Sequence, residues 1–180
     1  MDNSTEKIWQ TPQHPINQIL EAAPPPQIRI SPDRQWMVEL EQSQLVPIAL
    51  LAEVEVAVAG FRLNPQTNGP ARQNAYYSMK LKAVDSPENT RTIELPENPR
   101  IGFLKWSADS KKLAFTLTQE TGLELWSLHV ADATIHRLTE SVLNAAYGTP
   151  YRWLDDETLI CKFVSQTRGE APTKSNVPNG

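Results

Sequence analysis

Three stretches of the sequence repeat one pattern, in which a short apolar strand, a turn containing aspartate and a second strand follow one another. They are IRISPDRQWMVEL, FLKWSADSKKLAFTL and, more weakly, YRWLDDETLICKF. Apolar and polar side chains alternate beside each turn, which is typical of a hairpin with one buried face. Proline and aspartate suit the turn, because proline presets the backbone and aspartate bonds nearby amides. The pattern predicts repeated antiparallel hairpins.

The spacing of these repeats indicates how the hairpins are grouped. Aligned on Asp33, Asp109 and Asp156, with Trp153 in the place of Trp106, the repeats lie 76 and 47 residues apart. One β-propeller blade takes about 40 to 50 residues, so the longer interval fits one blade with a large insertion or two short blades. Two further hairpins, AYYSMKLKAV with TRTIEL and LELWSLHV with TIHRLT, supply the second halves of four-stranded blades.

The predicted fold class is all-β, an incomplete β-propeller of about three to four antiparallel blades over residues 28–180. Residues 1–27 show no sustained period and end in PPPQ, so they are predicted to form an irregular N-terminal arm. Only QILEAA and PIALLAE have helix propensity. Since a closed ring needs at least about four blades, an open strand edge is expected, and with it marginal stability or a partner.

Charge and composition exclude several classes of function. The net charge is −4, the pI is near 5.4 and the longest basic run is Lys111-Lys112, so no nucleic-acid partner is expected. Fifteen prolines against seven glycines fit proline-rich loops between short strands. The longest apolar run is broken by Pro47, Glu53 and Glu55, so no membrane partner is expected either. The acidic, polar N-terminus lacks the features of a signal or transit sequence, which predicts a cytoplasmic location.

Catalytic and cofactor motifs are missing from the sequence. It has no Gly-x-Ser-x-Gly, no Gly-x-Gly-x-x-Gly, no P-loop and no His-Glu-x-x-His. A single cysteine, Cys161, excludes an internal disulfide and is better interpreted as a small strand residue than as a nucleophile. No catalytic residue and no cofactor are therefore predicted.

Three other features have both a structural and a functional interpretation. His129 and His136 lie on the two arms of one predicted hairpin, but no third metal ligand is evident beside them, and His14 lies in the arm. No metal site is therefore predicted. Asp155-Asp156 is interpreted as part of a turn rather than as paired catalytic acids, because adjacent side chains point apart. Trp106 and Trp153 recur at one repeat position, so they are predicted to pack between blades rather than to stack on a ligand.

Together these stretches resemble the N-terminal propeller of the prolyl oligopeptidase family of serine peptidases, and its glutamyl endopeptidase-like branch of plastids and cyanobacteria. The segments that carry the resemblance are PPPQIRISPDRQWMVEL, LLAEVEVAVAGFRLNPQTNGPAR, WSADSKKLAFT, YRWLDDETLI, TRGEAP and VPNG. They run from about residue 24 to the last residue. The long AGFRLNP segment is the specific one, since W-S-x-D is shared by many propellers.

The resemblance implies that the chain is the first part of a larger enzyme. In the family, more blades and an α/β-hydrolase domain with serine, aspartate and histidine follow, whereas this chain stops at Gly180. It implies that the parent hydrolyses short peptides and that its propeller restricts access to the active site. No triad residue can be carried over. The implied partners are the remaining blades and hydrolase domain, and a peptide substrate only in the full assembly.

Residues 59–72, AGFRLNPQTNGPAR, combine two arginines with a density of turn-forming residues that no regular element tolerates. In the family this segment belongs to an insertion in the early propeller. One interpretation is consecutive turns in which the arginines bond loop carbonyls. The other directs the arginines toward the central cavity, where a guanidinium holds a substrate carboxylate. The candidate substrate-binding residues are Arg62, Asn64 and Arg72.

Two hypotheses of function follow. The first is a non-catalytic propeller portion of a serine peptidase, which gates or orients peptide substrates for a hydrolase domain absent from this chain. The alternative is a free-standing interaction module that binds another protein at its open blade edge. Whether the chain is part of an enzyme is left open by the sequence, because no nucleophile, base and oxyanion donors can be assembled from its motifs.

Overall fold

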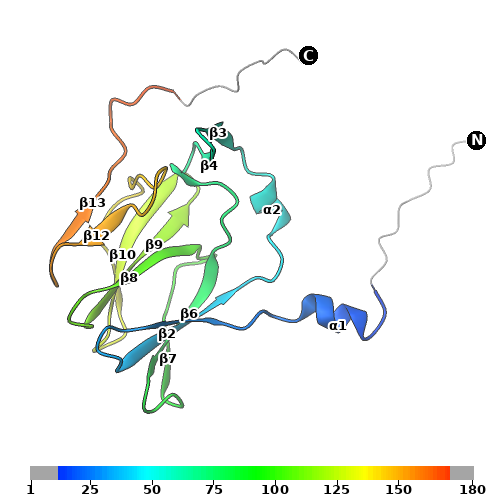
Figure 1. Ribbon diagram of the computed structural model, residues 1–180, viewed down its shortest axis with the longest axis vertical. Helices are drawn as coiled ribbons and strands as arrows, with labels where there is room; N and C mark the ends of the chain where they lie inside the picture. The colour runs from blue at the N-terminus through cyan, green and yellow to red at the C-terminus, as the bar shows by residue number, and fades with distance from the viewer. Residues whose placement is uncertain (1–11, 171–180) are drawn as a thin grey trace, which may run out of the picture.

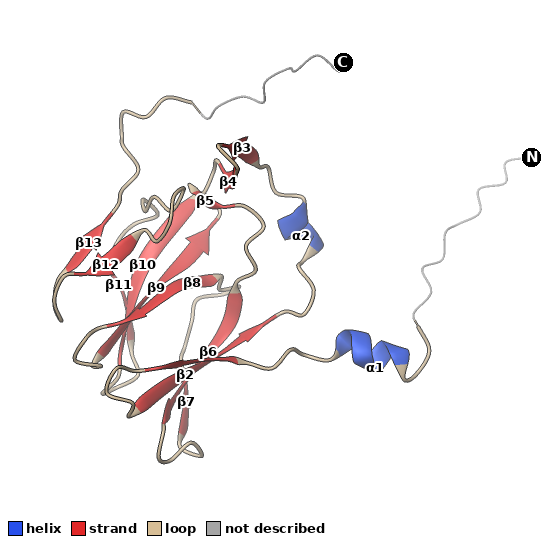
Figure 2. Ribbon diagram, in the orientation of Figure 1, coloured by secondary structure: helices blue, strands red, loops and turns tan. Residues whose placement is uncertain are grey.

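A computed structural model describes residues 12–170, which fold into an all-β structure with two short helices (Figures 1 and 2). The helices are α1 (Ile16–Glu21) and α2 (Ile48–Leu51). The strands are β1 (Gln27–Ile30), β2 (Trp36–Gln42), β3 (Val56–Val58), β4 (Phe61–Asn64), β5 (Gly69–Pro70), β6 (Tyr76–Ala83), β7 (Thr90–Thr92), β8 (Ile101–Trp106), β9 (Lys112–Gln119), β10 (Gly122–His129), β11 (Ile135–Arg137), β12 (Tyr151–Trp153) and β13 (Leu159–Cys161). These strands confirm the predicted hairpins. The VPNG motif and the first part of the arm lie outside the described residues.

Two four-stranded antiparallel meanders make up the largest sheet. The first meander has the order β1-β2-β6-β7, and the second has the order β8-β9-β10-β11. They are joined through the single pair Tyr76↔Ile101. Because β2 and β6 are neighbours in one meander, residues 43–75 are an insertion between adjacent strands. The long interval between the first two repeats is thus explained by an insertion.

The first meander buries one face and leaves the other partly exposed. Val38 and Leu40 of β2 and Met79 and Leu81 of β6 are fully buried in one apolar cluster. The opposite face carries an ion-pair ladder, because alternate residues of a strand point to opposite sides. In this ladder Lys80 and Lys82 pair with Glu39 and Glu41.

The second meander is buried on both faces. Leu113, Phe115 and Leu117 of β9 face the first meander and join its apolar cluster. Ala114, on the opposite face of β9, and Leu125 of β10 belong to a second cluster, which packs against the third hairpin. The regular alternation in LAFTL predicted only one buried face. Ala114 and Thr116 are also fully buried, because another sheet covers this side.

The third hairpin, β12–β13, covers that second face. Tyr151 of β12 is buried in the second cluster, and its hydroxyl donates to the carbonyl oxygen of Ala114 at 2.7 Å. Burial raises the pKa of Tyr151, which keeps the hydroxyl protonated as a donor. Trp153, Leu159 and Cys161 pack against the same cluster. The hairpin is therefore fixed to the second meander by apolar packing and by a buried hydrogen bond.

The turns of the first two repeats have the same local structure. In the first, Ser31 donates its backbone N–H to the Trp36 carbonyl at 2.8 Å, and Asp33 Oδ1 accepts from the Gln35 amide at 3.0 Å. In the second, the equivalent bonds are Ser107 to Lys112 at 2.9 Å and Lys111 to Asp109 at 3.1 Å. The sequence-predicted turn chemistry is confirmed in both repeats.

Adjacent repeats are also bonded to each other. The backbone N–H of Asp33 donates to Ser110 Oγ at 3.0 Å, and that of Asp109 donates to Asp156 Oδ1 at 2.8 Å. Beside these bonds, the indole N–H of Trp106 donates to the Arg29 carbonyl at 3.3 Å, and that of Trp153 donates to the Lys105 carbonyl at 3.0 Å. Both tryptophans also pack against the apolar clusters, which favours the predicted packing role over stacking on a ligand.

The predicted alignment of the third repeat is wrong by one residue at its turn. Asp155, not Asp156, has the role of Asp109, because its carboxylate accepts from the Glu157 and Thr158 amides. Asp156 instead has the role of Ser110, since it accepts the bond from the preceding repeat. The reason is that the third turn is one residue shorter, closing between Leu154 and Thr158.

Outside the sheets, α1 stands away from the body of the molecule and has no buried residue (Figures 1 and 2). Strand structure begins at Gln27, next to the predicted end of the arm. No helix among residues 12–170 is both long enough and apolar enough to cross a membrane.

The turn carboxylates predict a loss of stability in acid. Hydrogen bonds from Lys111 and Ser107 hold the pKa of Asp109 below its ordinary value of 3.8, and similar bonds lower the pKa of Asp33 and Asp155. The three ionised carboxylates therefore stabilise the folded protein at pH values above their ordinary pKa. This stabilisation is lost as the pH falls below that value and through their lowered pKa values in the folded protein. We expect the Asp109→Asn variant to show a smaller drop in the free energy of unfolding between pH 5 and pH 2.5 than the wild type.

Urea unfolding at several pH values measures this drop. Asp85→Asn is the matched control, because Asp85 lies outside the repeated turns. Equal slopes for Asp109→Asn and the wild type would contradict the prediction.

Candidate functional site

The insertion between β2 and β6 contains all the residues that the sequence predicted as substrate-binding. It comprises α2 and a small antiparallel sheet of β3, β4 and β5, in which β4 is central. Arg62 and Asn64 lie on β4, and Arg72 follows β5. In Figure 1 the hairpin β3–β4 lies at the end of the molecule opposite β7.

Asn64 organises the turn that follows β4. Its side-chain oxygen accepts from the backbone amides of Gln66 at 2.9 Å and Thr67 at 3.3 Å, and its side-chain amide donates to Glu53 at 2.9 Å. The side chain is buried, with 3% of its surface exposed. All these bonds are internal to the insertion, so Asn64 acts here as a turn residue.

Arg62 and Arg72 meet at one carboxylate. Arg72 Nε lies 3.0 Å from Glu55 Oε2, and Arg62 forms an ion pair with the other oxygen of Glu55. The Glu55 side chain is 19% exposed, whereas Arg62 and Arg72 are 65% and 43% exposed. Their partner is thus a carboxylate rather than the expected loop carbonyls. Since two guanidinium groups share one carboxylate, a net positive charge remains at this surface.

The tip of the insertion crosses to the second meander and to the segment before the third hairpin. The Asn68 carbonyl accepts from the Ala145 amide at 2.8 Å, and its side-chain oxygen accepts from Arg168. Gly69 lies against β10, where an added Cβ would come within 3.1 Å of Leu123 Cδ1. The asparagine–glycine pair therefore allows a close approach that a larger side chain at residue 69 would obstruct.

A polar hollow of about 930 Å³ lies beside this tip. Its walls are the insertion, the segment before β8 and the turn between β9 and β10. Glu53 binds Arg100 at 2.8 Å across the hollow and so ties the insertion to the second meander. Because Glu53 also accepts from Asn64, the carboxylate joins the predicted site to the rest of the fold.

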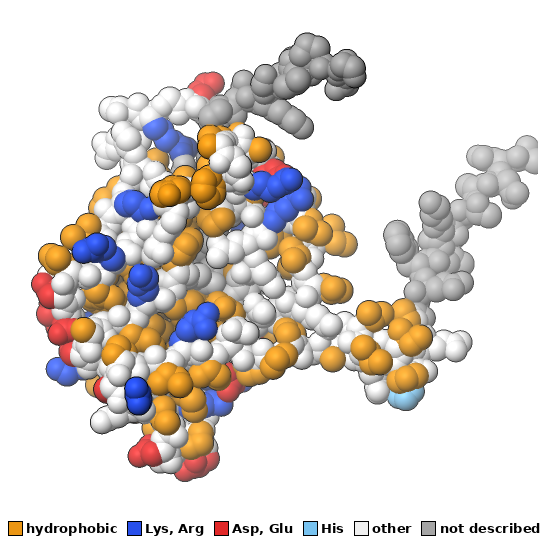
Figure 3. All heavy atoms as spheres, viewed as in Figure 1, with side chains coloured by type: hydrophobic (Ala, Val, Ile, Leu, Met, Phe, Trp, Pro, Cys, Tyr) orange, Lys and Arg blue, Asp and Glu red, His pale blue; other side chains and the backbone are white. Residues whose placement is uncertain are grey.

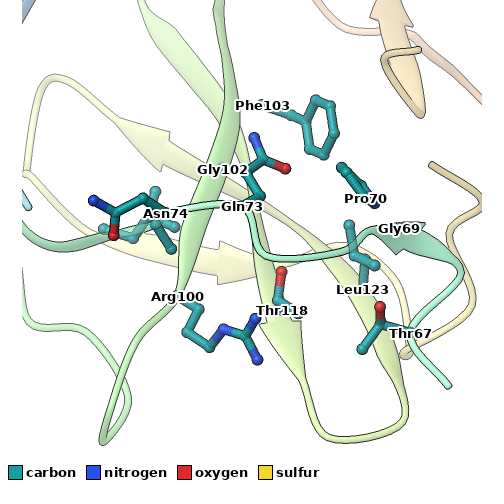
Figure 4. A pocket seen from close by; sticks show the side chains of 12 residues that line it. Thr67, Gly69, Pro70, Gln73, Asn74, Arg100, Gly102, Phe103, Thr118 and Leu123 are labelled. Carbon is teal, nitrogen blue, oxygen red and sulfur yellow. The ribbon is translucent and has the colours of Figure 1, made fainter. Parts of the chain in front are cut away.

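The smaller cavity in Figure 4 is not a ligand site. It lies between β5, β8 and β10 and is lined by Pro70, Phe103 and Leu123 among others. Its volume is about 20 Å³, which is room for one water molecule. Phe103 has a positive φ of 47° and lies in a β-bulge of β8. The bulge adds one residue to β8, so the side chains after it alternate between the two faces of the sheet in the opposite order to those before it.

Other candidate residues have structural surroundings. The rings of His129 and His136 lie 4.8 Å apart, but no group of three possible metal ligands exists among residues 12–170. Cys161 is half-buried, and burial raises its pKa, which disfavours the reactive thiolate. Asp155 and Asp156 bond to backbone amides, as the turn interpretation expected.

Comparison with curated proteins finds plant relatives that match most of this chain. The chain is 30% identical over 185 residues to a probable glutamyl endopeptidase of Arabidopsis thaliana, an alignment that covers 96% of this chain and 19% of the relative. It is 28% identical over 186 residues to a probable glutamyl endopeptidase of Oryza sativa subsp. japonica, covering 96% of this chain and 20% of the relative. The chain is related to peptidases. No family model matches the sequence.

Two consequences follow from these relatives. The chain spans about a fifth of the length of the curated relatives that it matches. The expected cytoplasmic location is contradicted, since both relatives are named as chloroplastic proteins. That expectation rested on the composition of the N-terminal residues, which does not decide the compartment.

The partners of the predicted site residues were missed at the sequence level. Glu53 and Glu55 bind the predicted residues, and Arg100 binds Glu53 in turn, yet the two glutamates were noted only as interruptions of an apolar run. Their alternation in AEVEV was the available signal, because residues two apart lie on one face of a strand. Arg100 had no such signal, since it lies 36 residues beyond Asn64 in the sequence.

The turn role of Asn64 predicts a loss of stability on substitution. In Asn64→Ala, two backbone amides lose their acceptor and Glu53 loses a donor, so the free energy of unfolding falls by about 1–3 kcal/mol. Urea denaturation measures the change, with Gln66→Ala as the control, since that side chain is exposed in the same turn. Equal stability of the two variants would show that the Asn64 bonds contribute little.

Proposed function

We propose that this chain is the non-catalytic N-terminal propeller portion of a prolyl oligopeptidase-like serine peptidase. In this proposal it gates or orients peptide substrates, and a hydrolase domain outside this chain cleaves them. The supporting observation is the relation to two probable glutamyl endopeptidases over 96% of the chain but only a fifth of each relative.

The stacking of the sheets supports a propeller. Two four-stranded antiparallel meanders and a further hairpin follow one another in the chain. Trp106 bonds the second meander to the first, and Trp153 bonds the hairpin to the second meander. Propeller blades are four-stranded antiparallel sheets of this kind. Within the third hairpin, Leu154 and Ile160 are 58% and 48% exposed. In the proposal, the next sheet of the assembly covers them.

The insertion supports a role in handling substrates. It reaches from the first meander to the segment before the third hairpin and presents Arg62 and Arg72 on its surface. An exposed guanidinium binds a carboxylate through paired hydrogen bonds. We assign Arg62 and Arg72 to the recognition of an acidic peptide side chain, with Asn64 holding the turn beside them.

The alternative, a free-standing interaction module, rests on the same exposed apolar faces. It differs in its partner, which is then another protein rather than the remainder of a peptidase. Mixing experiments separate the two hypotheses.

We expect peptidase activity to appear when the 180-residue chain is mixed with the remaining C-terminal portion of a relative. The measurements are hydrolysis of a fluorogenic glutamyl peptide and thermal melting of each part and of the mixture. A partner present at 100 times its Kd stabilises the chain by about 2.7 kcal/mol.

Ile160→Asp should weaken this association, because it places a charge on the face that the next sheet covers. Leu138→Asp is the control, since Leu138 is comparably exposed outside that face. No activity and no stabilisation on mixing would overturn the proposed function and favour an independent module.

Removing both arginines should lower the catalytic efficiency of the assembly with acidic substrates. In the mixed assembly, Arg62→Ala with Arg72→Ala lowers kcat/KM for a glutamyl peptide about 10- to 100-fold, because charged hydrogen bonds contribute about 1.5–3 kcal/mol. Cleavage of a peptide with glutamine in that position should change much less. Arg34→Ala, at an exposed turn of the first meander, is the control. Unchanged kinetics with the acidic peptide would exclude the assigned role.

A further inference from the structure

The hairpin β3–β4 has one polar and one apolar face. Directly opposite pairs are Val56↔Leu63, Ala57↔Arg62 and Val58↔Phe61. Since side chains alternate along a strand, Val56, Val58, Phe61 and Leu63 share one face. Arg62 lies on the other face, where it binds Glu55.

The apolar face lines a groove of about 380 Å³. Ala146, residues 168–170, Pro65 and Asn68 also line it. Three segments far apart in sequence thus form one concave surface. Its volume falls in the range of about 300–1,000 Å³ that is usual for ligand pockets.

Two aromatic residues lie next to residues that line the groove, Phe61 opposite Val58 and Tyr147 after Ala146. Phe61 and Tyr147 meet edge to face, with ring centroids 5.5 Å apart. They are 48% and 74% exposed, and Val58 beside them is 41% exposed. Exposed apolar side chains gathered in one place mark a binding surface more often than scattered ones do.

Arginines outnumber carboxylates when the groove and the other face of the hairpin are taken together. Arg168 lines it and donates to the neutral side chain of Asn68, and no ion pair of Arg168 is found within residues 12–170. Arg62 and Arg72 share one carboxylate on the other face of the thin hairpin. Glu170 is the acidic residue that lines the groove. Figure 3 shows hydrophobic side chains between groups of Lys and Arg at the end of the molecule that carries this hairpin.

We propose that this groove binds an apolar side chain of a peptide that carries acidic residues beside it. The apolar wall would take the side chain, while Arg168 would attract a flanking carboxylate. The inference takes the peptide ligand from the proposed function and adds a second recognition element, distinct from the Arg62–Glu55–Arg72 cluster.

The experiment measures direct binding of short peptides to the 180-residue chain, without any hydrolase portion. Three fluorescein-labelled peptides of equal length serve as probes, containing Glu-Leu-Glu, Lys-Leu-Lys or Glu-Ser-Glu at the centre. Fluorescence anisotropy is recorded at low salt and at high salt. We expect the Glu-Leu-Glu peptide to bind at least tenfold more tightly than the other two, and to weaken as salt is raised.

Variants test whether binding occurs in the groove. Val58→Ser should weaken binding of the Glu-Leu-Glu peptide about tenfold, since an apolar pocket contact is lost. Tyr147→Ser is a second variant at the mouth, and both positions are exposed enough to tolerate the change. Arg168→Gln should reduce the salt dependence. Leu138→Ser, a comparably exposed apolar position outside the groove, is the control.

Loss of binding in Val58→Ser and Tyr147→Ser, with Leu138→Ser unchanged, supports the proposal. It is overturned if the Glu-Leu-Glu peptide does not bind, if the three peptides bind equally, or if the groove variants bind like the wild type. These results are independent of the mixing experiment. Peptide binding without activity on mixing would reject the proposed function and keep the groove, whereas activity on mixing without peptide binding would do the reverse.

Discussion

Burial of the second meander on both faces is the constraint on which the rest of the structure depends. Phe115 faces the first meander and Ala114, its neighbour in sequence, faces the third hairpin. The strand β9 can lie between two sheets because its second face carries small side chains, which leave room for Leu125 and Tyr151. Burial of this apolar surface supplies the main stabilisation of such a stack, at about 25 cal/mol per Å².

Hydrophobic packing alone does not align one sheet with the next, because it has no direction. The directional bonds come from the repeated turns. Asp109 uses its side chain to close its own turn and its backbone N–H to bond Asp156 of the next repeat. Trp153 adds an indole bond to the preceding sheet. Equivalent bonds thus relate each repeat to the next.

The insertion uses this stacked body as its support. Asn68 at its tip is hydrogen-bonded to Ala145, and Glu53, which follows α2, forms an ion pair with Arg100. The insertion therefore contacts elements well beyond the meander from which it starts. The hairpin β3–β4 is therefore held over the sheets with an arginine pair on one face and an apolar groove on the other. Substrate orientation, as we propose it, depends on both faces of this hairpin.

Much of the fold was predictable, because hairpins depend on local alternation and on turn chemistry. The strands beside Ser31 and Ser107 were located correctly for this reason. The third turn was misaligned, since adjacent Asp155 and Asp156 satisfy the same local pattern and only the bond to Asp109 distinguishes them. The site was predicted in part. The sequence located Arg62, Asn64 and Arg72 in one segment but did not reveal their carboxylate partners.

The sequence by itself determined the all-β class and the repeated turns, because these depend on residues that are close together in the chain, whereas the pairing of β2 with β6 showed that the segment between them is an insertion. Only the tertiary structure decided which faces are buried and where the insertion docks. It also decided that Arg62 and Arg72 share Glu55 while Asn64 binds Glu53. The physical reason is that burial and ion pairing depend on which elements meet in space. The groove beneath the hairpin has the same origin, since Val58, Ala146 and Arg168 meet only when the chain is folded.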